Sequence, residues 1–135
     1  MLSLERRLRD AMIATCIRAL PDEGCGLLLG VREGERSVVR DVVASENVLH
    51  SAKVYEIDSK VLLHAYRRAD DEGLEVLGVF HSHTHTEAYP SPTDIAQAPD
   101  PAWHYVLVSL RDVPTVVRTY RIVDGAVSED EVVGH

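Results

Sequence analysis

Residues 81–94 read His-Ser-His-Thr-His-Thr-Glu-Ala-Tyr-Pro-Ser-Pro-Thr-Asp. The first three of them end a run that begins at residue 76, is rich in branched side chains and contains a glycine. Such a run predicts a β-strand over residues 76–83. Side chains at positions i and i+2 of a strand point to the same face of a sheet. His81 and His83 are therefore expected on one face of this strand, where both imidazoles can bind the same metal ion.

Asp94 is the third candidate ligand of this metal ion. It falls in the first turn of a short predicted helix, which Ser91 caps and Pro92 begins. The loop between strand and helix is long enough to fold the carboxylate back toward the imidazoles. Two neutral imidazoles and one carboxylate suit Zn²⁺ and leave a fourth position open for water. The segment thus predicts a site for one zinc ion of the catalytic kind.

A hydrolase with such a site also needs a carboxylate outside the ligand set to take a proton from water. Zinc lowers the pKa of water and so generates the nucleophile. Glu23 is the best candidate for this carboxylate, because it lies just before a continuous apolar run over residues 26–31 that predicts a strand. From its position alone, a plain surface acid after Pro21 and Asp22 is an equal alternative.

Hydrophobic periodicity and turn residues predict an α+β fold, a mixed sheet flanked by helices. Apolar residues at helical spacing predict a helix that Ser3 caps and that runs to about Leu20. Asp58 caps a second helix, and Gly73 ends it. Residues 47–55 are less regular and predict a loop or an edge strand. The other predicted strands cover residues 26–31, 37–44, 104–110, 115–123 and 127–133, the last two joined by a turn at Asp124-Gly125.

The composition is that of one globular domain covering residues 1–135. Its formal net charge of -8 argues against a nucleic-acid partner, which requires a basic face. No apolar stretch approaches the length of a membrane span, and residues 1–20 carry charges throughout, unlike a secretion signal. Cys16 and Cys25 are too few for a disulfide framework and are interpreted as buried thiols. We therefore expect a cytoplasmic protein, and the sequence leaves its oligomeric state open.

The spacing of these motifs resembles the signature of the JAMM (MPN-plus) family of zinc metallopeptidases. The signature combines a glutamate shortly before Cys-Gly-Leu-Leu, then His-Ser-His, then a Pro-Ser pair with aspartate three residues after the serine. The resemblance implies a single-domain MPN/JAMM fold, similar to that of cytidine deaminases. The implied ligands of one zinc ion are His81, His83 and Asp94. The implied catalytic residues are Glu23, as general base, and Ser91, which helps to hold the oxyanion.

Three further segments, residues 84–94, 104–109 and 120–127, are similar to the bacterial Mec-type subgroup of this family. The similarity implies a zinc-dependent peptidase or isopeptidase whose partner and substrate is a ubiquitin-like sulfur-carrier protein. Such an enzyme hydrolyses the amide bond after the carrier's terminal Gly-Gly and releases cysteine or a short carboxy-terminal extension. The short interval between Glu23 and His81 agrees with the minimal bacterial form. The alternative is a catalytically silent MPN scaffold that only binds a ubiquitin-like partner.

Other residues near the motif have competing interpretations. Thr84 stands where the family often has proline, a position that shapes the loop and supplies no ligand. His85 continues the alternation and is a weaker candidate for the metal. The order His85-Thr86-Glu87 resembles the His-x-Glu of nucleotide deaminases, but the Pro-Cys-x-x-Cys segment of those enzymes is absent from the sequence. Possible substrate contacts are Asn47, Tyr55, Glu87 and Tyr89, and the histidines interpreted as structural or exposed are His50, His64, His104 and His135.

Overall fold

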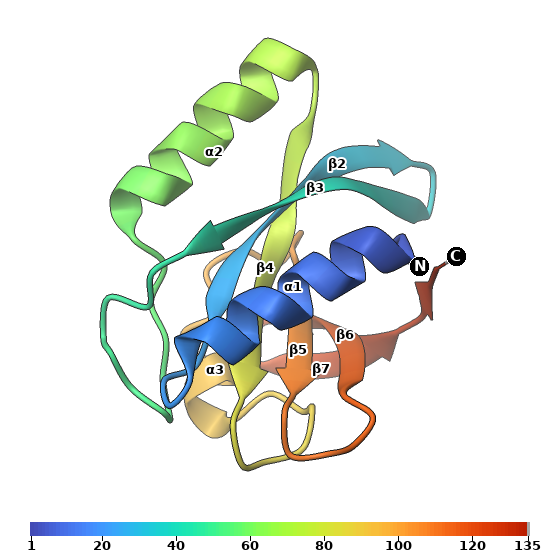
Figure 1. Cartoon of the computed structure of the whole chain (residues 1–135). Coiled ribbons are helices and arrows are strands. Elements are labelled where there is room, and N and C mark those ends of the chain that lie inside the picture. The colour runs from blue at the N-terminus through green and yellow to red at the C-terminus, as the bar shows by residue number, and fades with distance from the viewer. Residues whose placement is uncertain (135) are drawn as a thin grey trace.

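An eight-stranded mixed sheet forms the body of the molecule in the computed structural model, which describes residues 1–134 (Figure 1). His135 lies outside the described residues, so its interpretation is not tested. The strand order is β7-β6-β5-β4-β2-β3-β1-β8, with β4 and β5 parallel and β2 antiparallel to both of its neighbours. The elements are β1 (Leu2–Ser3), α1 (Arg6–Ala19), β2 (Cys25–Glu33), β3 (Arg36–Ser45), α2 (Ser59–Glu72), β4 (Glu75–His83), α3 (Pro92–Ala96), β5 (His104–Ser109), β6 (Val116–Val123), β7 (Ala126–Asp130) and β8 (Val132–Val133). The predicted α+β class is confirmed.

Helices α1 and α2 cover opposite faces of the sheet. Strand β2 shows this directly, because Leu28 packs in the cluster that contains Met12 of α1, whereas Leu27 and Leu29 pack in the cluster that contains Ala65 of α2. All three leucines are fully buried. The central strands are therefore apolar on both sides, which explains why residues 26–31 form a continuous apolar run.

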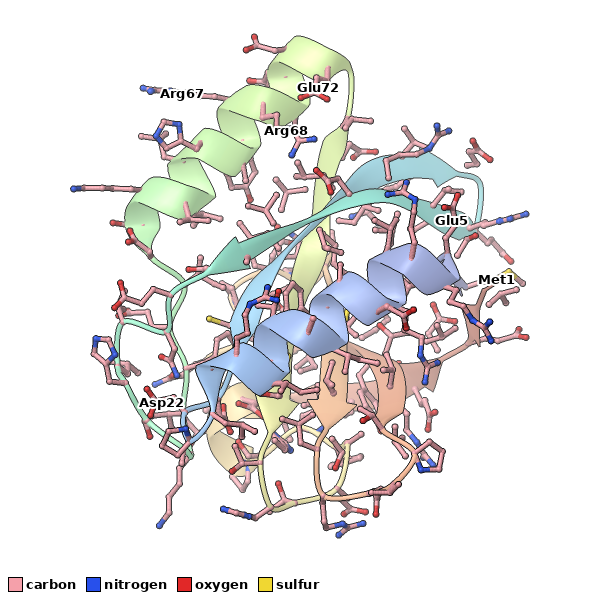
Figure 2. All side chains as sticks on the ribbon, viewed as in Figure 1. Met1, Glu5, Asp22, Arg67, Arg68 and Glu72 are labelled. Atoms are coloured by element: carbon pink, nitrogen blue, oxygen red, sulfur yellow. The ribbon has the colours of Figure 1, made fainter. Side chains whose placement is uncertain are left out.

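One ion pair links α2 to the sheet, and a second lies within the helix. Arg68 lies 2.6 Å from Asp41 of β3 and 2.7 Å from Glu72, one turn further along the helix. Figure 2 shows Arg68 directed toward the strands and Arg67 directed away from them. The predicted ends of α2 are confirmed: Asp58 accepts a hydrogen bond from the Lys60 amide, and Gly73 takes the left-handed conformation with φ 68°.

The sheet curls so far that its two edge strands, β7 and β8, follow one another in the sequence. β7 and β8 are separated only by Glu131, yet they are the opposite ends of the strand order. The Leu2 amide donates to the Glu131 carbonyl at 2.8 Å, and the amino terminus of Met1 pairs with Asp130 at 2.7 Å. The first strand, β1, and the last strand, β8, lie side by side as a result (Figure 1).

This closure corrects two predictions. Ser3 does not cap α1: it belongs to β1, where its backbone pairs with Val38, and Glu5 precedes the helix without a capping side-chain bond. The predicted strand over 127–133 is also two strands, because the chain changes edge at Glu131. In both places backbone pairing with a distant segment outweighs the local pattern. Among residues 1–134, no helix is long and apolar enough to cross a membrane.

His104 makes stability depend on pH. Its Nε2 contacts the Ser37 hydroxyl at 2.9 Å, its Nδ1 has no partner among residues 1–134, and its side chain is buried. Burial, and then the positive charges of Arg121 and Arg32, lower its pKa to about 4, although Asp130 raises it. The unfolded chain therefore binds this proton more readily between about pH 6.5 and pH 4. We expect up to about 3 kcal/mol of stability to be lost as the pH falls through this window.

Urea unfolding of the wild type and of the variant His104→Gln across this pH range checks the expectation. Glutamine does not titrate, so the acid-induced loss should be smaller in the variant, and the two free energies of unfolding should converge as the pH falls. Parallel pH profiles would contradict the assignment.

Candidate metal centre

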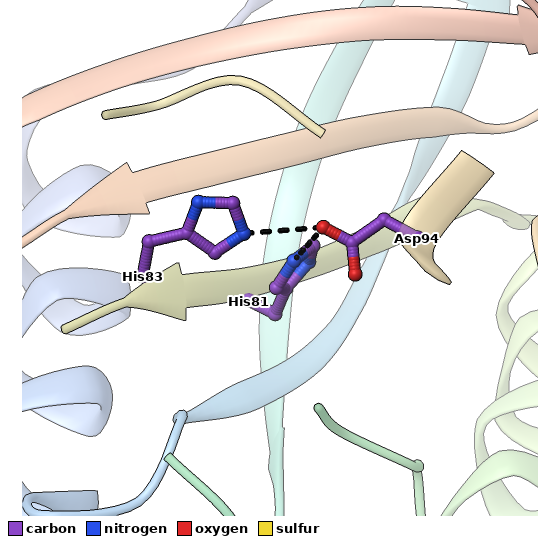
Figure 3. A group of neighbouring side chains, drawn as sticks. All are labelled: His81, His83 and Asp94. Atoms are coloured by element: carbon purple, nitrogen blue, oxygen red, sulfur yellow. Dashed lines mark hydrogen bonds and ion pairs between the residues drawn. The ribbon is translucent and has the colours of Figure 1, made fainter. Parts of the chain in front are cut away.

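Two histidines and one aspartate converge where β4 ends and α3 begins (Figure 3). The Nε2 atoms of His81 and His83 lie 3.0 Å and 3.1 Å from the same carboxylate oxygen, Oδ2 of Asp94. The three candidate ligand atoms are all within 4.8 Å of one another, and this is the one such group that residues 1–134 contain. The structure therefore brings together all three residues that the sequence predicted as ligands.

The aspartate is held by the start of α3. Ser91 precedes the helix, and its hydroxyl accepts a hydrogen bond from the Asp94 amide at 3.1 Å. The Asp94 carboxylate in turn accepts from the Ser91 amide at 2.9 Å, which completes a capping box. The predicted cap is confirmed, and it fixes the carboxylate oxygen that faces the histidines.

The histidine rings are oriented by their surroundings. His83 donates its Nδ1 hydrogen to the Glu87 carbonyl at 2.8 Å, which leaves Nε2 as the atom that can bind a metal. Tyr55 stacks on the His81 ring with a centroid distance of 4.1 Å, and His81 Nδ1 has no partner among residues 1–134. Residues 47–55 therefore do border the site, as the sequence suggested for Tyr55.

The electrostatics of the three groups are coupled. Burial lowers the pKa of His81 more than its hydrogen bond to Asp94 raises it. Burial also lowers the pKa of His83, but the bonds to Asp94 and the Glu87 carbonyl outweigh this effect, and that pKa is raised. The pKa of Asp94 lies well below its usual range, because the hydrogen bonds from the histidines overcome the effect of burial. The carboxylate is thus ionised and draws positive charge toward the point between the rings.

The donor set fits a divalent metal ion such as zinc. It offers two ring nitrogens and one carboxylate oxygen, and all three side chains are nearly inaccessible to solvent. His85 is exposed and is not part of the cluster, so it is not a competing ligand in this arrangement. The cluster is therefore complete without it.

Glu23 is a buried acid beside this cluster. Its side chain is 3% exposed, and its Oε1 has no hydrogen-bond partner among residues 1–134. Burial raises its pKa to about 8; His83 lowers it and Asp94 raises it further. The alternative of a plain surface acid is therefore wrong. A carboxyl group with this pKa can exchange a proton near neutral pH.

Three hydrogen bonds fix the backbone at Glu23 and Gly24. The Glu23 amide donates to the Ser51 carbonyl at 2.8 Å, and Asn47 donates to the Glu23 carbonyl at 3.1 Å. The next amide, that of Gly24, donates to the Ser82 hydroxyl at 2.8 Å. Ser82 lies between the two histidines in the sequence, so one strand positions both the ligands and the acid.

Asn47 is the centre of the loop that borders the site. It is 6% exposed and makes five hydrogen bonds through its side chain, to Glu23, Leu49, Ser51, Val54 and Glu56. Sequence reasoning considered Asn47 only as a possible substrate contact. An asparagine in an irregular loop is a weak signal, and only the fold shows which backbone groups it satisfies.

We expect Asn47→Ala to lower the free energy of unfolding by about 3 kcal/mol, because several buried backbone groups lose their partner. It should also lower turnover, since the Glu23 carbonyl is among those groups. Urea unfolding and turnover measurements test both effects. Leu49→Ala, a change of an exposed side chain in the same loop, is the control and should shift stability by less than about 0.5 kcal/mol. Equal effects of the two substitutions would remove the organising role of Asn47.

Two hollows adjoin the cluster, and they share no lining residue. The first, which we call the apolar groove, has a volume of about 500 Å³ and includes Tyr55, Ile57, Leu62, Val79, Asp94 and Trp103. The second, which we call the small hollow, has a volume of about 270 Å³ and includes Glu23, Lys53, His83, Thr84, Thr86 and Ser91. The five predicted site residues thus lie together, or line a hollow that contacts the cluster.

Comparison with known proteins agrees with this geometry. Residues 5–123 match the family model described as prokaryotic homologs of the JAB domain. The chain belongs to this family. The JAMM resemblance seen in the sequence is thereby confirmed.

Curated relatives and solved structures extend the comparison. The chain is 43% identical over 126 residues to the CysO-cysteine peptidase of Mycobacterium tuberculosis, covering 93% of this chain and 85% of the relative. It is 39% identical over 98 residues to a probable TtuB-protein conjugate cleaving protease of Thermus thermophilus, covering 72% and 63%. A solution structure from Desulfitobacterium hafniense superposes with a TM-score of 0.93 at 33% identity, covering 100% and 93%. A JAB1/MPN domain protein from Archaeoglobus fulgidus shares the fold at a TM-score of 0.61 and 18% identity, covering 99% and 94%.

Proposed function

We propose that this chain is a zinc-dependent peptidase that hydrolyses the amide bond after the carboxy-terminal Gly-Gly of a ubiquitin-like sulfur-carrier protein. The observation that carries the proposal is the convergence of His81, His83 and Asp94 beside the unpartnered, buried carboxyl of Glu23. The similarity to a CysO-cysteine peptidase over most of both chains supports the substrate class.

His81, His83 and Asp94 would hold one zinc ion in this proposal. When bound, such an ion supplies Lewis acidity, which activates water and polarises the substrate carbonyl. Glu23 takes a proton from the attacking water and passes it to the departing amine. In the metal-free protein burial raises its pKa to about 8, which favours the protonated acid that delivers the proton to the amine. Next to the positive charge of a bound ion, Glu23 favours the carboxylate form, which takes the proton from water.

Ser91 donates a hydrogen bond to the oxyanion that develops on the cleaved carbonyl. Its hydroxyl oxygen accepts from the Asp94 amide, so its own hydrogen remains available. This orientation follows from the helix cap. Ser91 thus caps α3 through its hydroxyl oxygen and stabilises the oxyanion through its hydroxyl hydrogen.

The carrier's extended tail occupies the apolar groove. The groove runs along the loop of residues 54–57 and reaches Asp94, the only ligand of the cluster that lines it. Glycines at the end of the tail let its backbone pass close to the buried cluster, since they carry no side chain. The carbonyl to be attacked then lies between the groove and the small hollow.

The test is intact-mass analysis of a sulfur carrier extended by one cysteine after Gly-Gly, incubated with zinc-loaded protein and with chelator-treated protein. Loss of the cysteine only with zinc is the expected result. An unchanged carrier, with zinc bound in a one-to-one ratio, would sink the peptidase proposal. It would favour instead the catalytically silent scaffold that binds a ubiquitin-like partner.

A further inference from the structure

The two hollows beside the cluster differ in which reacting groups they contain. Glu23, His83 and Ser91 line the small hollow, whereas Asp94 lines the apolar groove. In the proposed function, on which this inference rests, Glu23 delivers the proton to the departing amine. A proton donor must lie on the side of the group that leaves. The departing group therefore occupies the small hollow.

The charges of the two hollows also differ. The apolar groove is lined by two acids, Glu56 and Asp94, and by no lysine, arginine or histidine. The small hollow contains Lys53, and its only acid is Glu23. An anionic group is therefore repelled from the groove and accepted in the small hollow.

Lys53 is available to bind such a group. Its side chain is exposed and forms no ion pair among residues 1–134. Its backbone is fixed, because its amide donates to the Ser51 hydroxyl at 3.0 Å and Asn47 donates to the adjacent Val54 carbonyl at 3.0 Å. The ammonium group thus moves on a flexible stem from an anchored base.

The rim of the small hollow is closed by a bond between two loops. The Thr84 hydroxyl donates to the Ala52 carbonyl at 3.4 Å, which ties the residue before Lys53 to the segment after the second histidine. The family often has proline at this position, and proline has no hydroxyl with which to make this hydrogen bond. The lining also includes the small side chains of Ala52, Thr86 and Ser91, beside Glu23, His83 and the exposed His85. The hollow suits one small residue beyond the cleaved bond.

The negative charge of the whole chain increases the need for a cation, such as Lys53, to bind a substrate carboxylate. The net charge of -8 repels a substrate that ends in a carboxylate, and Lys53 is one of only two lysines in the sequence. A conjugate joined through a lysine side chain presents no carboxylate one residue beyond the cleaved bond. A single carboxy-terminal amino acid does.

We propose that the small hollow binds the one amino acid that is released, with its free α-carboxylate paired to Lys53. Hydrolysis breaks the C–N bond after the second glycine and forms a C–O bond from one water molecule. One proton of that water goes to the departing amine, so no other reactant is needed. The enzyme thereby selects carboxy-terminal extensions of a single residue over isopeptide conjugates.

The test compares two substrates that differ only at the end of the chain. One is a sulfur carrier ending in Gly-Gly-Cys with a free carboxylate, and the other carries a terminal carboxamide. We expect zinc-loaded wild type to cleave the free acid with a kcat/KM about tenfold higher, as the loss of one charge-assisted contact implies. Lys53→Gln should lower the rate for the acid to that for the amide and leave the amide unchanged. Lys60→Gln, which removes the other lysine, is the matched control and should change neither rate.

The outcomes separate this inference from the function on which it rests. Equal rates for acid and amide in the wild type, or an equal loss for both with Lys53→Gln, would overturn the carboxylate site and leave the peptidase intact. Cleavage of neither substrate, with zinc bound, would remove the peptidase and this site together. Calorimetric titration of both substrates into the Glu23→Gln protein gives a readout without turnover, in which the preference for the acid should also depend on Lys53.

Discussion

Glu23→Gln is expected to lower kcat by about a thousandfold while zinc stays bound. General acid–base catalysis contributes about 10²–10⁴-fold, and an amide cannot accept the proton of the attacking water. The three candidate ligands do not include Glu23, so the metal content should remain one ion per chain. The assay is the release of cysteine from a Gly-Gly-extended carrier, with the metal measured in the same samples. Full turnover by a zinc-loaded variant would show that another group moves the proton.

The same substitution has an expected effect on stability that tests the electrostatics separately. Burial raises the pKa of Glu23 to about 8, so the folded protein favours the protonated acid. Ionisation of this group therefore costs stability as the pH rises from about 4.5 to 8 in the metal-free protein. Glutamine carries no such cost, and the metal-free variant should be more stable than the metal-free wild type above this window. Glu33→Gln, a change of an exposed acid at the end of β2 and away from the cluster, is the control and should leave both turnover and stability unchanged.

The ligand cluster could be predicted from the sequence because local rules place each member. The two-residue period of a strand sets His81 and His83 on one face, and helix capping sets Asp94 at the start of α3. The segment between them is short, so few arrangements of the three side chains are possible. Family resemblance added the catalytic roles of Glu23 and Ser91, and Glu23 comes from a different part of the chain, just before β2.

The features that the sequence did not predict depend on contacts between distant segments. Serine is a favoured residue type at helix caps, but the backbone of Ser3 pairs with β3 and β8 at the point where the sheet closes. The five hydrogen bonds of Asn47 and the burial that raises the pKa of Glu23 arise only in the folded chain, where residues 47–51 contact the backbone of Glu23. Periodicity and turn chemistry describe neighbours in sequence, so they carry no information about either.

Asp94→Asn is expected to abolish zinc binding at micromolar concentrations and turnover with it. Asparagine keeps an oxygen that can accept from the Ser91 amide, so the cap of α3 and the fold should survive. It lacks the charge that holds a divalent ion between His81 and His83. Even partners that only contact ligands cost about 10–100-fold in metal affinity when they are removed, so a ligand itself should cost more.

Thermal and urea unfolding with and without zinc distinguish loss of the metal from loss of the fold. A ligand at a hundred times its Kd adds about 2.7 kcal/mol to the stability of a protein that binds it only when folded. Wild type and the exposed-site control Asp112→Asn should both gain this increment, and Asp94→Asn should gain none. Without metal, Asp94→Asn should be less stable than wild type at neutral pH, and this difference should shrink as the pH falls. The pKa of Asp94 is depressed in the folded protein, so its contribution to stability disappears in acid. A variant that still gained stability from zinc would place the ion elsewhere and leave the three converging side chains as a buried ion pair.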